Sequence, residues 1–185
     1  MLGLIFSKII SGGQTGVDRA TLDVALELGI PCGGWCPKGK IAEDGPIDPQ
    51  YPLKETKTAK YQFRTEANVM EADGTLILTS GTPTGGTAFA IQVTLKHKKP
   101  YLVIGLNQKS NPSIIRDWAN MIKIGILNVA GPREAKFPES MRRRKIWQAS
   151  LSAKDERVVF QNQYYESHFI IVSVRRENLK GEDQQ

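Results

Sequence analysis

The chain has 185 residues and a formal net charge of +6, a length that suits one domain with a substantial buried core. No stretch approaches about 18 consecutive apolar residues, and residues 1–10 are too short and too interrupted for a signal peptide, so the sequence favours a cytoplasmic protein over a membrane protein. The net positive charge is divided equally between residues 1–131 and 132–185. The one dense run of basic residues, Arg142–Lys145, lacks interleaved aromatic residues. Nucleic acid is therefore not favoured as a partner, and the charge suits an anionic small molecule.

The first predicted unit is a strand over 4–10, a glycine-rich turn and a helix from about Val17 to Leu28. Residues 11–19 read Ser-Gly-Gly-Gln-Thr-Gly-Val-Asp-Arg. Glycines let the backbone turn sharply, so N–H groups and the helix dipole can face an anion such as phosphate. The spacing fits neither the dinucleotide nor the nucleotide triphosphate fingerprint, and a turn that only packs helix on strand is the alternative. We predict ligand contacts from Gly12, Gly13, Gln14, Thr15, Gly16, Asp18 and Arg19.

A short strand around 30–34 leads into a long loop, Cys36–Tyr51, that is too rich in glycine and proline for regular structure. Long irregular loops inside compact domains are usually functional or disordered, and the prolines favour an ordered binding loop. The two cysteines, Cys32 and Cys36, lack the Cys-x-x-Cys spacing and are predicted to be free thiols. The charged residues of the loop that we expect to contact a ligand are Lys38, Lys40, Glu43 and Asp44.

A second glycine-rich loop follows a predicted helix over 61–72, with Phe63, Ala67 and Met70 facing inward, and a strand over 75–79. Residues 80–87 read Ser-Gly-Thr-Pro-Thr-Gly-Gly-Thr and lead into a helix over 87–98. Such loops meet at the carboxyl edge of a parallel sheet, where a ligand binds. The predicted contacts are Gly81, Thr82, Pro83, Thr84, Gly85, Gly86 and Thr87. Thr84 could simply cap the helix, and Arg64 is expected to form a surface ion pair.

The chain continues with a strand over 101–105, a helix that starts at Asn111-Pro112 and a strand over 126–130. The apolar stripe of this helix is Ile114, Ile115, Trp118, Met121 and Ile122. The last strand leads to a third loop, in which Arg133 could pair with a phosphate.

Strands that alternate with helices predict an α/β fold, Rossmann-like and doubly wound, with a mainly parallel sheet in a three-layer sandwich. Residues 1–136 form the predicted cofactor-binding domain, and residues 137–185 form a C-terminal tail with no assigned role. In this tail, 138–153 could be a basic helix, while 158–160 and 169–174 have the composition of strands.

Five ordered motifs within residues 8–136 together resemble the molybdenum cofactor carrier proteins. They are Ile-Ser-Gly-Gly-Gln-Thr-Gly-Val-Asp-Arg at 10–19, Cys-Pro-Lys-Gly-Lys-Ile-Ala-Glu-Asp-Gly at 36–45, Tyr-Pro-Leu-Lys-Glu-Thr at 51–56, Thr-Gly-Gly-Thr at 84–87 and Asn-Val-Ala-Gly-Pro-Arg-Glu at 128–134. The resemblance implies a Rossmann-type fold, a homo-oligomer and binding of molybdenum cofactor (molybdopterin), a pterin with a dithiolene and a terminal phosphate. It also adds Asn128 to the expected site.

The resemblance extends to nucleoside-phosphate hydrolases once described as lysine decarboxylases. Their second loop reads Pro-Gly-Gly-x-Gly-Thr-x-x-Glu, and its glutamate serves glycosidic cleavage. Here Gly86-Thr87 aligns with the Gly-Thr pair, and Ala90 occupies the position of the glutamate. Because glycosidic hydrolysis needs a carboxylate near the bond, we predict a carrier or binding protein rather than an enzyme, without catalytic residues or metal ligands. The alternative is a hydrolase of nucleoside monophosphates or other phosphoribosyl compounds, with Glu43 or Asp44 as its acid.

Overall fold

The computed structural model describes residues 6–106 and 113–135 with their side chains, and the backbone alone of residues 136, 148–151, 157–161 and 169–173. The elements up to residue 106 are β1 (Lys8–Ile10), α1 (Val17–Glu27), β2 (Cys32–Cys36), β3 (Ile41–Ala42), β4 (Gly45–Pro46), β5 (Leu53–Glu55), α2 (Tyr61–Glu71), β6 (Gly74–Thr79), α3 (Gly85–Lys96) and β7 (Tyr101–Gly105). The elements that follow are α4 (Ser113–Met121), β8 (Ile126–Ala130), η1 (Glu134–Lys136), β9 (Gln148–Leu151), β10 (Arg157–Gln161) and β11 (Phe169–Ser173).

Six strands form one parallel sheet in the order β5-β2-β1-β8-β6-β7. Every residue of β6 is buried, as expected for a central strand with helices on both faces. The predicted Rossmann-like α/β fold is therefore confirmed. None of the helices in the described part of the chain combines the length and apolar character needed to cross a bilayer.

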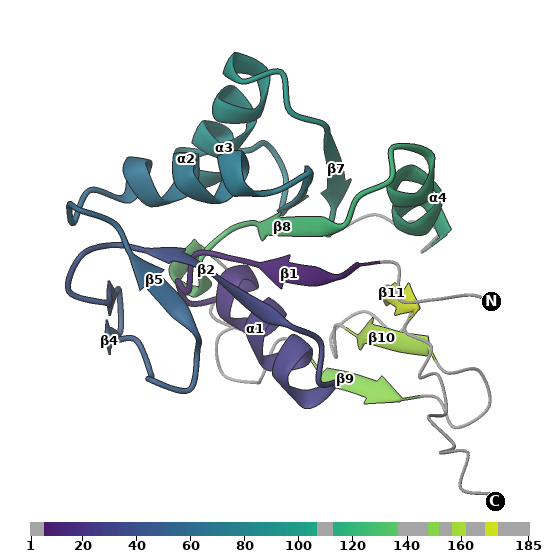
Figure 1. Ribbon diagram of the computed structural model, residues 1–185, viewed down its shortest axis with the longest axis horizontal. Helices are drawn as coiled ribbons and strands as arrows, with labels where there is room; N and C mark the ends of the chain where they lie inside the picture. The colour runs from purple at the N-terminus through teal and green to yellow at the C-terminus, as the bar shows by residue number, and fades with distance from the viewer. Residues whose placement is uncertain (1–5, 107–112, 137–147, 152–156, 162–168, 174–185) are drawn as a thin grey trace, which may run out of the picture.

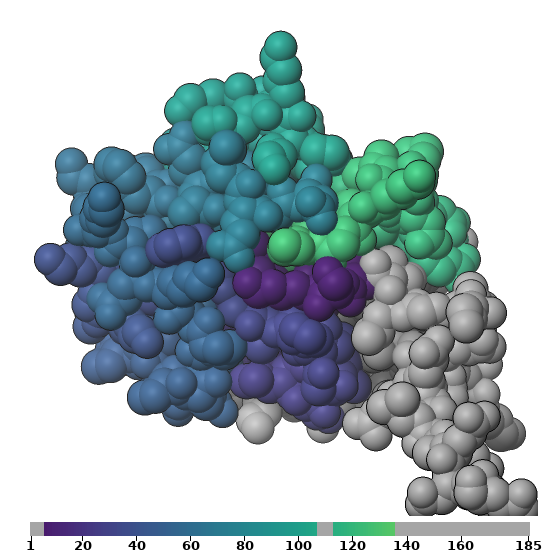
Figure 2. All heavy atoms as spheres, viewed as in Figure 1, coloured from purple at the N-terminus to yellow at the C-terminus, as the bar shows by residue number. Residues whose placement is uncertain are grey.

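Helices cover both faces of the sheet, with α2 and α3 on one side and α1 on the other (Figure 1). The largest apolar cluster joins α1 and α4 to one face, through residues such as Val24 of α1 and Ile115 of α4. On the other face α2 and α3 contact each other, and Ala90 of α3 packs on Ile77 of β6. Figure 2 shows the segment that contains the long loop and β5, in blue, beside the purple N-terminal segment that contains α1. A second apolar cluster joins these elements, and it includes Leu22 of α1 and Leu53 of β5.

The strand order brings three distant loops together at one edge. β1, β8 and β6 are neighbours in the sheet, and their carboxyl ends lead to the first, third and second loops respectively. The helices that follow β1 and β6 leave on opposite faces of the sheet. This is the topological switch point at which open α/β sheets bind their ligands.

The prediction that Phe63 and Met70 face inward on α2 is wrong. Phe63 and Met70 are 53% and 47% exposed, and the buried face instead contains Asn68. The amide of Asn68 bonds both backbone groups of Trp35 in β2, accepting from its N–H over 2.8 Å and donating to its C=O over 2.9 Å. The helix therefore turns a polar residue toward the strand, because the backbone groups of that strand need hydrogen-bond partners.

Other predicted elements differ from the structure in detail. The long loop contains the short β3–β4 hairpin, and β5, which follows it, joins the main sheet. In α4 the stripe is only partly buried, with Ile114 and Met121 44% and 75% exposed. The two cysteines are free, as predicted. Residues 4–5 of the first predicted strand and the Asn111-Pro112 helix start lie outside the described residues.

The C-terminal segments form a separate antiparallel sheet in the order β11-β10-β9. The strands predicted at 158–160 and 169–174 are confirmed as β10 and β11, apart from residue 174, which lies outside the described residues. The basic helix predicted over 138–153 is wrong at 148–151, where β9 pairs with β10 instead. The remainder of that predicted helix also lies outside the described residues.

Candidate functional site

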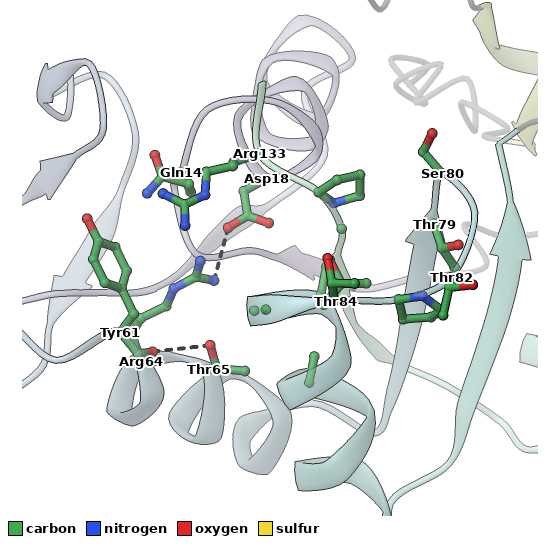
Figure 3. Close-up of a pocket in the computed structure, with 18 residues that line it drawn as sticks. Gln14, Asp18, Tyr61, Arg64, Thr65, Thr79, Ser80, Thr82, Thr84 and Arg133 are labelled. Atoms are coloured by element: carbon green, nitrogen blue, oxygen red, sulfur yellow. Dashed lines mark hydrogen bonds and ion pairs between the residues drawn. The ribbon is translucent and has the colours of Figure 1, made fainter. Parts of the chain in front are cut away.

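A cavity of about 310 Å³ opens at the switch point, between the three loops and α2 (Figure 3). This volume lies at the lower end of the range of small-molecule sites. The residues that line it are Gln14, Asp18, Tyr61, Arg64, Thr65, Thr79, Ser80, Thr82, Pro83, Thr84, Gly85, Gly86, Thr87, Ala90, Ala130, Gly131, Pro132 and Arg133.

The N-terminus of α3 faces open space in this cavity. Thr84 precedes the helix in an extended conformation, but its side chain makes no capping hydrogen bond. The first N–H groups of a helix have no intrahelical partner, so those of Gly85, Gly86 and Thr87 are available to a ligand. A Cβ built on Gly85 or Gly86 would meet no atom within 4 Å. The positive end of this helix dipole is therefore an accessible anion site.

The backbone of the first glycine-rich loop is covered by the protein itself. A Cβ on Gly12 would lie 1.8 Å from Arg64 Nη1, and one on Gly13 would lie 2.4 Å from a methyl carbon of Leu53. Gly16 packs against the third loop, where its Cβ would be 2.6 Å from the carbonyl oxygen of Pro132. This loop therefore needs glycine for close packing, and it contributes to the cavity through the side chains of Gln14 and Asp18.

Asp18 and Arg64 form a buried ion pair on the wall of the cavity. Arg64 Nη1 lies 2.9 Å from Asp18 Oδ2, and the two side chains are 14% and 4% exposed. Burial raises the pKa of Asp18, and the nearby charge of Arg64 opposes that shift. Arg64 Nε is buried and has no hydrogen-bond partner among the described residues. The guanidinium thus retains hydrogen-bonding capacity at the cavity wall.

Glu43 connects the long loop to the first and third loops. Its Oε1 accepts hydrogen bonds from Thr15 Oγ1 and, over 3.2 Å, from the Ala135 N–H. Its own N–H donates to Gln14 Oε1 over 2.9 Å, and its Oε2 lies 3.3 Å from Arg133 Nη1. Both carboxylate oxygens of Glu43 therefore have protein partners, and the residue does not line the cavity.

Asp44 pairs with Arg19, and Arg19 Nη2 donates to Asp44 Oδ1 over 3.1 Å. This hydrogen bond lowers the pKa of Asp44, so its carboxyl group is ionised at neutral pH. Lys38 is exposed and Lys40 half-buried, both on the long loop. Asn128 is buried within the sheet, where its amide donates to Thr75 Oγ1 over 3.3 Å.

Part of the predicted site thus lies on the cavity, namely Gln14, Asp18, Thr82, Pro83, Thr84, Gly85, Gly86, Thr87 and Arg133. The other predicted residues do not line it, namely Gly12, Gly13, Thr15, Gly16, Arg19, Lys38, Lys40, Glu43, Asp44, Gly81 and Asn128.

Arg64 is the main cavity residue that sequence reasoning missed. It was expected to form a surface ion pair, and its partner, Asp18, lies 46 positions earlier in the chain. One signal in the sequence that could indicate a role at the cavity is the adjacent polar pair Arg64-Thr65 on the helix before the second glycine-rich loop. The other missed cavity residues are Tyr61, Thr65, Thr79, Ser80, Ala90, Ala130, Gly131 and Pro132.

Comparison with known proteins gives this site a context. Residues 9–149 match the model of the family described as "Circularly permutated YpsA SLOG family". A crystal structure at 1.45 Å resolution of a protein from Syntrophus aciditrophicus SB, described as "Putative molybdenum carrier protein", is similar with a TM-score of 0.72 and 45% identity, over 75% of this chain and 89% of that chain. Comparison with curated proteins gave no match. Since the family match spans most of its length, the chain belongs to the circularly permutated YpsA SLOG family.

Proposed function

We propose that this protein binds and carries molybdenum cofactor or a related phosphorylated pterin. The terminal phosphate would occupy the N-terminus of α3, and Arg64 would face it from α2. The observation that carries the proposal is the uncapped start of α3, where open glycine positions face a cavity with a buried guanidinium in its wall. The description of the Syntrophus protein as a molybdenum carrier supports the choice of ligand.

The residues around the cavity fit a phosphorylated ligand. Gly86 lines the cavity, and a Cβ at that position would project into open space. Arg64 Nε is a buried donor without a partner among the described residues. A phosphate at this position would accept hydrogen bonds from the helix N–H groups and from the guanidinium, which prefers bidentate anions.

Loading with the cofactor tests the proposal. Full-length protein is mixed with molybdenum cofactor released from a purified molybdoenzyme and is then separated from free cofactor by gel filtration. We expect pterin and molybdenum to elute with the protein in equal amounts. Elution of the protein without pterin would contradict the proposed function. Pterin without molybdenum would restrict it to the metal-free cofactor.

The alternative function is hydrolysis of nucleoside monophosphates, and it makes a distinct prediction. Glu43 and Asp44 are held by protein partners, and Asp18 is the one carboxylate on the cavity among the described residues. Asp18 faces Arg64, and Ala90 occupies the position of the glutamate of the nucleoside-phosphate hydrolases. We therefore expect incubation with adenosine monophosphate to release no adenine above the protein-free background. Adenine release that Asp18→Asn abolishes would establish the hydrolase instead.

The proposal includes a homo-oligomer and a cytoplasmic location, as the resemblance and the composition imply. Native mass spectrometry of the full chain measures the oligomeric state directly. A monomer at micromolar concentration would contradict the first of these expectations, and recovery of the protein outside the cytoplasmic fraction of its own source would contradict the second.

A further inference from the structure

Glu43 and Arg133 form an ion pair whose members are held very differently. Glu43 is fixed by Thr15, by the Ala135 N–H and, through its backbone, by Gln14. The Arg133 side chain is 50% exposed, and its contact with Glu43 is the one ion pair that it makes within the described residues. Arg133 also lines the cavity. Its guanidinium can therefore turn toward a ligand while the Glu43 carboxylate stays in place.

A phosphate in the cavity would compete with Glu43 for this guanidinium. A half-exposed ion pair stabilises the fold weakly. A phosphate dianion carries more charge than a carboxylate and accepts a bidentate contact from arginine. Arg133 would therefore exchange Glu43 for the phosphate. The net gain in binding free energy is smaller than that of the Arg133–phosphate contact, because the contact with Glu43 is lost.

We propose that Glu43 is a positioning residue that keeps Arg133 at the rim of the cavity and limits how tightly the site holds a phosphate. This inference rests on the proposed function, because it assumes that phosphate binds at α3. Glu43 thereby acts on the ligand through Arg133. A carrier needs such a limit, since a cargo that is bound too tightly is not released.

The test is a titration of inorganic phosphate into ¹⁵N-labelled full-length protein at constant pH and ionic strength, followed through the amide signals of Gly85 and Gly86. Glu43→Gln retains a side-chain oxygen for Thr15 and Ala135 but removes the charge that engages Arg133. We expect this variant to bind phosphate roughly threefold more tightly than the wild type, a change in line with the weakness of exposed ion pairs. In an Arg133→Ala background the same substitution should have no effect.

The matched control is Asp48→Asn, which removes one negative charge from the same loop at an exposed position away from the cavity. It should change the phosphate affinity less than 1.5-fold, a limit of about 0.2 kcal/mol. Weaker or unchanged binding by Glu43→Gln would overturn the inference, and so would tightening that persists without Arg133. If phosphate shifts neither glycine amide in the wild type, the α3 site itself is wrong and the inference falls with it.

Discussion

Replacing Gly86 by valine is expected to weaken binding of phosphate and of the phosphorylated pterin by at least about 100-fold. The new side chain would occupy the open space in front of the first N–H groups of α3. Two or more hydrogen bonds to a charged group would be lost, each contributing about 1.5–3 kcal/mol. The backbone of Gly86 lies outside the positive-φ region, and valine has a slightly higher helix propensity than glycine, so the substitution should leave the stability of the fold nearly unchanged.

The control for this substitution is Gln92→Val, which places the same β-branched residue at an exposed position of α3 away from the cavity. Affinity is measured by the phosphate titration and by cofactor loading, and stability by thermal unfolding. We expect similar unfolding temperatures for the two variants and loss of binding in Gly86→Val alone. Binding of wild-type strength in Gly86→Val would mean that the phosphate does not sit at the helix N-terminus.

Much of the fold could be predicted because its signals are local. The strands over 101–105 and 126–130 begin and end where the sequence places them, since apolar runs bounded by proline and glycine fix both ends. The alternation of strands and helices is sufficient to predict a parallel sheet. The order of the strands is not local, and it decides that the loops after β1, β8 and β6 meet.

The cavity was less predictable, because glycine has two roles that look alike in sequence. Gly13 and Gly86 both stand in glycine-rich turns before a helix. The first packs against Leu53 of β5, a strand that is absent from the predicted elements, while the second faces open space. Likewise, the partners of Glu43 lie 28, 29, 90 and 92 positions away in the chain. Which glycine is packed and which acid is paired depends on tertiary contacts.

Replacing Arg64 by methionine should destabilise the protein by about 3–5 kcal/mol, because it leaves the Asp18 carboxylate buried without its counter-charge. Asp18 is 3% exposed, so water cannot compensate for the loss. The folded-state pKa of Asp18 is already raised by burial, and removal of Arg64 raises it further. A raised carboxyl pKa means that the folded state binds the proton more tightly than the unfolded state. The contribution of Asp18 to the stability of the variant should therefore be most favourable below its unfolded pKa of about 3.9 and should fall as pH rises toward the folded pKa.

A second substitution separates this structural effect from ligand binding. Asp18→Asn in the Arg64→Met background removes the buried charge, so chemical denaturation at pH 7 should show most of the lost stability restored and the added pH dependence abolished. Phosphate affinity should stay at least about tenfold below that of the wild type, because the guanidinium that faces the helix N-terminus is still absent. If the double variant binds phosphate as tightly as the wild type, Arg64 serves only to neutralise Asp18 and to cover Gly12. If it recovers pH independence but not stability, methionine fails to fill the space of the guanidinium, and the packing of Arg64 on Gly12 outweighs its charge. Added pH dependence that persists would show that a group other than Asp18 titrates.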